Sequence, residues 1–383
     1  MTATDVITPP SAPADGRQEL RSWMAGLWLV VGLELKQRIR STKWKAALLT
    51  VAVLIAIVTG LIVLASRVSS GDGGSEGDWV FGLVVFFVLF LGLIISPTLS
   101  ATAINGDAKE GTLAPLQATG LGASQIVVGK LLAAWTASLS FVVIAIPFLA
   151  FAYVNSDANA WAMATVVVVL AVELLVVCAL GLGWSALTPR TAASAVLTYV
   201  TVAVLTVVLP VMFGLLAATF TKEVEVNSAW REYVYTESGS PIPDNAVKDD
   251  FGEYYVCREQ TYTTTVPRTE LTWWMLAVNP YVIVADSAPL PPRGNQTYWD
   301  GGMLGSIKQG VRELRLGLTA SYDDCAPGET QEEADRRERL ESLSPVWPWG
   351  IAVQSVLAVA SVWVAIRRVR VPYGTLTAGT RVA

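Results

Sequence analysis

Long apolar stretches separated by short polar ones form the main pattern along this chain. Six stretches are nearly free of charge and long enough to cross about 30 Å of hydrocarbon at about 1.5 Å per residue. They cover residues 46–66, 79–104, 131–154, 161–187, 192–220 and 349–366. The pattern therefore predicts six transmembrane helices.

Residues inside and beside these stretches support the prediction. Tryptophan, whose amphipathic ring favours the membrane interface, stands at the ends of several of them, at Trp79, Trp161, Trp347 and Trp349. The third and fifth stretches contain Pro147 and Pro210. Proline has no N–H, so each is expected to kink its helix and to free a carbonyl that a neighbouring group must satisfy.

The residues before the first span differ in character. Residues 1–19 contain three prolines and are expected to form a disordered tail. Residues 20–45 mix Trp23 and Trp28 with many charges, including Arg38, Arg40 and Lys43. This stretch is too charged to span, and it predicts an amphipathic helix on the inner membrane surface.

The distribution of Lys and Arg predicts the orientation. One side of the membrane receives the basic run from Lys36 to Lys45, then Lys109, Lys130, Arg190 and the arginines that follow the sixth span. Because Lys and Arg are enriched in cytoplasmic loops, both termini, including the tail 367–383, are expected in the cytoplasm. An even number of crossings agrees with this arrangement.

Residues 221–348 then lie outside and are numerous enough for a domain. They carry 21 Asp and Glu against 12 Lys and Arg. Alternation over 254–265 predicts a strand, helical spacing from Met303 to Leu318 predicts a helix, and the charged run 328–343 predicts a solvated helix or loop. We expect a mixed α+β extracytoplasmic domain on an otherwise all-α polytopic membrane protein.

Residues 272–285 form a further apolar stretch within this outer segment. Asn279-Pro280 interrupts it, and the residue before a proline is biased away from helical geometry. The stretch is therefore expected to pack on the outer membrane face rather than to span.

Composition restricts the chemistry. Of 383 residues, 53% are hydrophobic and 15% charged, and the chain has no histidine. The commonest general base and metal ligand is thus missing, and we expect no catalytic or metal-binding residues. Cys257 and Cys325 share the oxidising outer segment, which favours a disulfide over two unrelated thiols, whereas Cys178 is expected in the core of the fourth span.

Glu173 lies in the middle of the fourth predicted span. An ionisable group there costs about 2.5–3.5 kcal/mol on insertion scales and usually faces protein or water. Two interpretations stay open: a polar site that lines a transport path, or a hydrogen-bonded packing residue.

The cytoplasmic loop between the second and third spans has a distinctive sequence. A short helix is expected from Asp107 to about Ala118, with acidic residues near its start and Leu113 and Leu116 on one side. Such a helix at the membrane surface suits docking to a partner protein.

This loop resembles the one that follows the second helix in ABC-2 type exporter permeases. The resemblance rests on Glu110, Gly111, Thr112, Leu113, Leu116, Gly129 and Lys130, together with the N-terminal helix and the six spans. In that family the loop contains the coupling helix that fits a groove on the ATPase. The resemblance therefore implies a coupling role for Asp107, Lys109, Glu110, Gly111, Thr112, Leu113 and Leu116. The enlarged outer loop is similar to that of an actinobacterial branch.

The chain has no phosphate loop of its own. The P-loop has four residues between its glycines and Ser or Thr after its Lys, whereas six residues lie between Gly122 and Gly129, and Leu131 follows Lys130. We therefore expect no enzymatic activity and no cofactor in this chain. The resemblance implies two partner ATPase subunits that bind ATP and Mg²⁺, a second permease copy, identical or related, and a bacterial plasma membrane, without nucleic acid.

Two rival functions stay open. A membrane-anchored sensor would bind a ligand through the outer domain, but the sequence predicts no cytoplasmic domain to receive the signal. An intramembrane enzyme would need paired catalytic groups at one depth, and only Glu173 is found there. The substrate cannot be read from the sequence.

Overall fold

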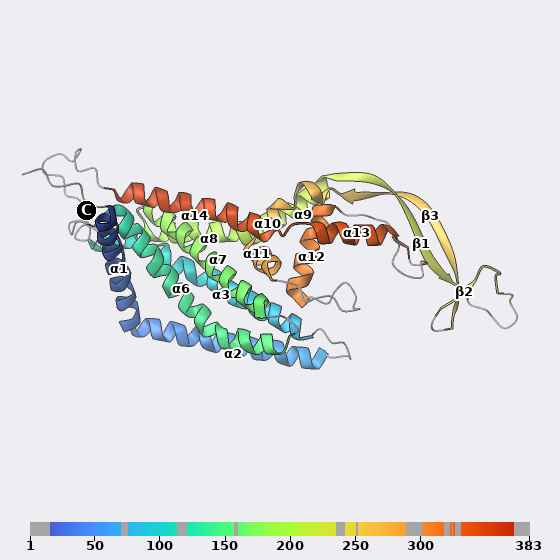
Figure 1. Cartoon of the computed structure of the whole chain (residues 1–383), viewed down its shortest axis with the longest axis horizontal. Helices are drawn as coiled ribbons and strands as arrows, with labels where there is room; N and C mark the ends of the chain where they lie inside the picture. Colours follow the sequence, from blue (N-terminus) through green and yellow to red (C-terminus); the bar gives the residue numbers. More distant parts are fainter. Residues whose placement is uncertain are drawn as a thin grey trace, which may run out of the picture. The chain divides into compact units, whose positions relative to one another are not determined.

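A computed structural model describes residues 16–69, 76–112, 121–156, 160–234, 242–249, 252–288, 302–317, 322–323, 325 and 331–370. The chain divides into two compact units. The first contains residues up to 203 together with those from 352 onward, and the second contains residues 204–351. Figure 1 draws the elements of both.

The described residues contain six helices that are long and apolar enough to span a membrane, which confirms the prediction. The first four are α2 (Thr42–Ser69), α3 (Glu76–Ser100), α6 (Ala123–Val154) and α7 (Ala160–Leu187). The fifth combines α8 (Thr191–Ala203), a π-helical turn η1 (Val204–Val208) and α9 (Leu209–Thr219), and the sixth is α14 (Trp347–Val369).

The first unit is a helical bundle with α3, α6 and α7 at its centre. These helices pack against one another, and small residues let them approach closely. A side chain on Gly181 of α7 would collide with Ser100 of α3, because its Cβ would lie 2.2 Å from Oγ. In contrast α2 is mostly exposed, with Leu49, Val53 and Ile57 on its surface. Its exposed apolar surface suits contact with lipid.

Helix α1 (Gly16–Arg40) runs across the bundle at a steep angle to α2 (Figure 1). Its inner face, with Leu27, Val30 and Val31, is buried. It contacts α6 at Gly129, where an added Cβ would lie 2.8 Å from the Val30 side chain. This arrangement confirms an N-terminal helix, although it covers residues 16–40 rather than 20–45 because α2 begins at Thr42. Its place on the inner membrane surface stays a prediction.

The second unit confirms the mixed α+β segment between the fifth and sixth spans. Its sheet has the order β2-β3-β1-β4, and the elements are β1 (Thr221–Tyr233), β2 (Val247–Lys248), β3 (Tyr254–Pro267) and β4 (Tyr322–Asp323). β1 and β3 form a long antiparallel ribbon, from Thr221 opposite Pro267 to Tyr233 opposite Tyr255. The predicted strand 254–265 is β3, whereas β1 was not predicted.

The helices of this unit are short. They are η2 (Thr269–Leu271), α10 (Trp274–Ala277), α11 (Pro280–Ser287), α12 (Gly302–Leu316) and α13 (Gln331–Ser342). The charged run 328–343 thus contains a helix. The apolar stretch 272–285 forms two short helices that are interrupted at Asn279, as expected from the following proline.

The π-helical turn of the fifth span has a chemical cause. Pro210 has no N–H, so the carbonyl of Thr206, four residues earlier, loses its usual donor. Asn279 Nδ2 donates to this carbonyl at 3.1 Å, while Asn279 Oδ1 accepts from Tyr281 N at 2.8 Å and caps α11. The freed carbonyl that the sequence predicted is therefore satisfied by a residue of the segment between the fifth and sixth spans.

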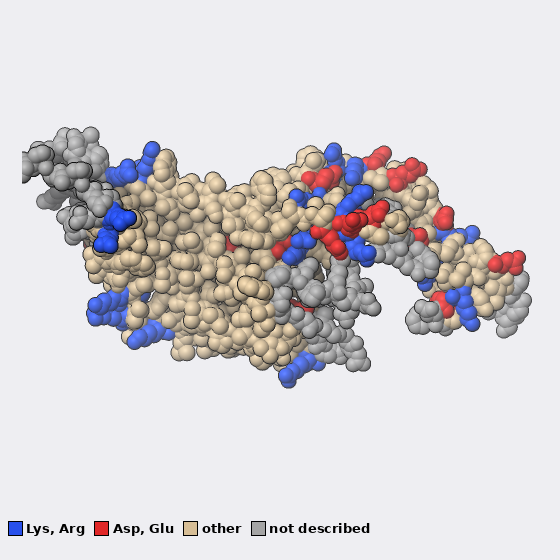
Figure 2. All heavy atoms as spheres, viewed as in Figure 1, with Lys and Arg blue, Asp and Glu red and all other residues tan. Residues whose placement is uncertain are grey.

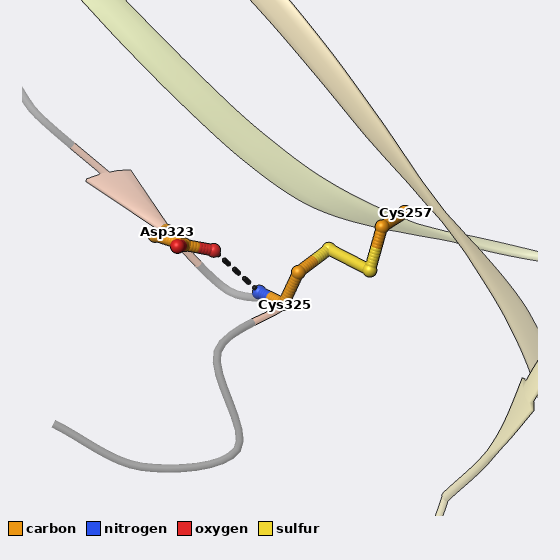
Figure 3. Close-up of a disulfide and its surroundings, with 3 residues drawn as sticks. All are labelled: Cys257, Asp323 and Cys325. Carbon is orange, nitrogen blue, oxygen red and sulfur yellow. Dashed lines mark hydrogen bonds between the residues drawn. A yellow bond between two sulfur atoms is a disulfide. The ribbon is translucent and has the colours of Figure 1, made fainter. Parts of the chain in front are cut away.

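A disulfide joins Cys257 of β3 to Cys325, which confirms the predicted pairing (Figure 3). The two Cα atoms are 5.9 Å apart. Asp323 lies beside the bridge, and its Oδ1 accepts from Cys325 N at 3.0 Å. The bridge thus fastens the chain beyond α12 to the ribbon. Cys178 is free and buried, as expected.

Candidate functional site

The helix that begins the predicted coupling segment ends at Glu110. α4 runs from Asn105 to Glu110, so the prediction of one uninterrupted helix from Asp107 to Ala118 is wrong at Gly111, and residues 113–118 lie outside the described residues. Gly111 ends it with a φ of 71°, a left-handed conformation that glycine adopts without a steric penalty. The N–H groups of Gly111 and Thr112 bond back to Ala108 and Asp107, which is a Schellman closure.

The end of α4 is open to solvent. Lys109, Glu110, Gly111 and Thr112 are all exposed, whereas Asn105 at its start is buried. Leu113 and Leu116 lie outside the described residues. The exposed end can therefore meet a partner protein while the start of the helix stays inside the bundle.

The first anchor of α4 is an ion-pair cluster around Lys130 of α6. The Lys130 side chain is 3% exposed, and its Nζ lies 2.5 Å from Glu34 Oε1 of α1 and 2.6 Å from Asp107 Oδ2 of α4. A buried cation needs such partners, because an unpaired charge in a protein interior is costly. One lysine thus connects three helices.

Arg38 of α1 lies one helical turn beyond Glu34. Its guanidinium donates to the carbonyl of Leu99, at the end of α3, at 3.2 Å. Burial lowers the pKa of Arg38, and the nearby Glu34 carboxylate opposes that shift. Arg38 therefore adds α3 to the set of helices joined near α4.

The second anchor is a hydrogen-bond network around Asn105. Its Nδ2 donates to Ser194 Oγ of α8 at 3.0 Å and to the carbonyl of Thr188 at 3.1 Å. Ser185 Oγ of α7 donates to Asn105 Oδ1 at 3.2 Å and accepts from the backbone N–H of Ile104 at 3.0 Å. Because these groups are buried and mutually satisfied, they set the position of α4 against α7 and α8.

Polar contacts also dock α1 onto the start of α6. Trp23 Nε1 donates to Ser124 Oγ at 3.1 Å, and Gln125 Nε2 donates to the carbonyl of Trp23 at 3.0 Å. Gln125 Oε1 accepts from Gly122 N at 2.6 Å and so caps the start of α6. These contacts fix α1, and with it Glu34, relative to Lys130.

The sequence identified only part of this site. Lys130 was singled out within the family signature and Asp107 within the loop, but their contact was not predicted. Asn105, Ser185 and Ser194 were missed, because partners about 80–90 positions apart along the chain carry no local signal. Their one available signal is the presence of polar residues at the ends of otherwise apolar spans.

Glu173 is separate from this site. It is fully buried in α7 and interacts with the side-chain amide of Gln354 in α14. Neither Oε atom has a partner that satisfies full hydrogen-bond geometry among the described residues. The pair joins the fourth and sixth spans inside the bundle, and a role for Glu173 in a transport path stays a prediction.

Comparison with known proteins adds one finding. The family described as ABC-2 family transporter protein matches residues 28–366, which include Glu34, Asn105, Asp107 and Lys130 but not the first half of α1. No curated protein matches the chain.

Proposed function

We propose, starting from the fact that this chain belongs to the ABC-2 transporter family and is a membrane permease component of an ABC transporter, that it is an exporter permease in which α4 transmits the movement of a separate ATPase. The supporting observation is the structure of α4. It has an exposed end, Lys109–Thr112, and a start that is bonded to helices on both sides.

The mechanism follows from these contacts. A push on the exposed end of α4 reaches α1 and α6 through Asp107 and Lys130, and reaches α7 and α8 through Asn105. A short helix with so many buried anchors moves with its neighbours rather than bending alone. ATP binding to the partner would thus bias the bundle between inward-facing and outward-facing states.

The complete transporter would contain two permease chains, identical or related, and two ATPase subunits that bind ATP and Mg²⁺. Both termini and α4 would face the cytoplasm of a bacterial cell, because the basic residues concentrate in the loops and tail on that side of the spans. The segment between the fifth and sixth spans would lie outside, where oxidising conditions maintain the bridge between Cys257 and Cys325.

The test replaces Leu113 and Leu116 by Asp, which would leave two unpaired charges in an apolar contact. The variant should insert normally and lose the ATPase that co-purifies with the wild-type chain. The matched control replaces Ala192 and Ala193, exposed in the first turn of α8, by Asp. It adds the same charge where a helix N-terminus tolerates it, and it should retain the ATPase.

Two results would contradict the proposal. Normal ATPase recovery with the Leu113 and Leu116 variant would show that docking does not use this loop. If the wild-type chain recovers no ATPase under conditions that preserve the complex, the sensor becomes the better interpretation.

A further inference from the structure

The junction between α1 and α2 carries a surface that the proposed coupling does not use. Four exposed cations lie within ten residues, and we call them the basic belt: Lys36, Arg40, Lys43 and Lys45. None of them forms an ion pair with a residue that the structure describes. In Figure 2, Lys and Arg gather at this end of the first unit.

Three other cations of the same unit are engaged by the protein. Lys130 contacts two carboxylates, Arg38 donates to a backbone carbonyl, and Arg367 lies 3.9 Å from the ring centroid of Trp363. Among the described residues the basic belt has no such partner, and the sequence explains why. No Asp or Glu occurs between Leu35 and Ser70, so the counter-charge must come from outside this part of the chain.

An exposed apolar stripe leads into the basic belt along α1. It consists of side chains that are 39–59% exposed: Met24, Trp28, Leu29 and Leu33. Leu29 and Leu33 are four residues apart and therefore lie on one face of α1. This exposed face is separate from the buried face that packs on the bundle. A soluble surface rarely keeps such a stripe in water beside a row of cations.

The chemistry of this surface fits one partner. An amphipathic helix with an apolar stripe and adjacent lysines binds at the boundary between headgroups and acyl chains. Juxtamembrane basic clusters attract anionic lipids in the same way. We infer that the basic belt and the apolar stripe of α1 are a binding site for anionic phospholipids, with the belt on the headgroups and the stripe against the acyl chains.

The site also has a route to α4. Glu34 is on the same helix, next to the stripe and the belt, and its carboxylate contacts Lys130, which holds Asp107. Anionic lipid that holds α1 in place would therefore favour the anchored arrangement of α4. This second step rests on the proposed coupling, whereas lipid binding itself does not.

The experiment measures lipid selectivity without an ATPase. The full chain is reconstituted in phosphatidylcholine bilayers that contain a trace of spin-labelled phosphatidylglycerol or spin-labelled phosphatidylcholine. Electron spin resonance then gives the motionally restricted fraction of each lipid. The wild-type chain should restrict more phosphatidylglycerol than phosphatidylcholine, and high salt should reduce the difference.

Two belt variants and one site control sharpen the result. Replacing Lys36, Lys43 and Lys45 by Gln should remove most of the preference, whereas replacing the same lysines by Arg keeps the charge and should retain it. The site control replaces Arg367, Arg368 and Arg370, three exposed arginines at the end of α14, by Gln and should also retain it. Because all six side chains are exposed, the variants should elute as the wild type does on size exclusion.

The outcomes separate the inference from its alternatives. Equal restriction of both lipids by the wild-type chain overturns it, as does an equal loss of preference in the Gln variant and the arginine control. If the wild type shows no preference and the Gln variant loses a co-purifying protein, the belt binds an acidic protein instead. Failure of the ATPase-docking test alone leaves the lipid result unchanged.

Discussion

At the scale of single residues, Lys130 is the most consequential position in the site. Its ammonium contacts Glu34 and Asp107 on two other helices. Removing one partner from a buried ion pair costs about 3–5 kcal/mol, and the partial exposure of the two carboxylates, 24% and 29%, reduces that cost. The loss of stability on replacing Lys130 is thus expected to be large but below the upper end of this range.

We therefore predict that Lys130→Met destabilises the chain by about 2–4 kcal/mol, because two neighbouring carboxylates are left without a cation. The measurement is the thermal unfolding midpoint in detergent. Lys109→Met, at the exposed end of α4, is the matched control and should change stability by less than about 0.5 kcal/mol.

A double variant tests whether the cluster is the cause. If Lys130 acts through Asp107, then Asp107→Asn should cost little in the Lys130→Met background, because it removes one of the repelling charges. Additive losses from the two substitutions would show that they act independently.

At the scale of elements, the spans and the helix α12 were predictable, whereas the end of α4 and the strand β1 were not. Spans follow from twenty or so apolar residues, a signal that tertiary contacts rarely override. The break at Gly111 was not predicted, because the helical pattern of the sequence continues beyond this glycine, whereas its left-handed conformation ends α4. β1 was missed because its buried positions do not alternate regularly. Its partner strand β3 begins only at Tyr254, so their pairing leaves no local signal in the sequence of β1.

The kink of the fifth span allows a prediction on one element. Asn279→Leu keeps the approximate size of the side chain but removes the donor to the Thr206 carbonyl and the acceptor for Tyr281 N. Each of these part-buried hydrogen bonds contributes about 0.5–1.5 kcal/mol, so the unfolding midpoint should fall.

The same site provides its own control. Pro210→Ala restores an N–H that can bond to the Thr206 carbonyl within the helix. Asn279→Leu should therefore be less damaging in the Pro210→Ala background than in the wild type. An equal loss in both backgrounds would mean that the interaction with Thr206 does not stabilise the turn.

At the scale of the whole molecule, the family and the six spans are established, whereas the orientation is a prediction. It rests on the basic residues at the α1 and α2 junction and on the acidic excess of residues 221–348. The proposed coupling depends on it, because an ATPase could reach α4 only from the cytoplasm.

Thiol labelling in intact cells tests the orientation. In a Cys178→Ala background the disulfide occupies both remaining cysteines, so a single added cysteine gives the signal. Thr42→Cys and Asn245→Cys both replace exposed residues. An impermeant maleimide should label Asn245→Cys in intact cells and should label Thr42→Cys only after permeabilisation. The reverse pattern would place α4 outside the cell, and the proposed coupling to an ATPase would then be untenable.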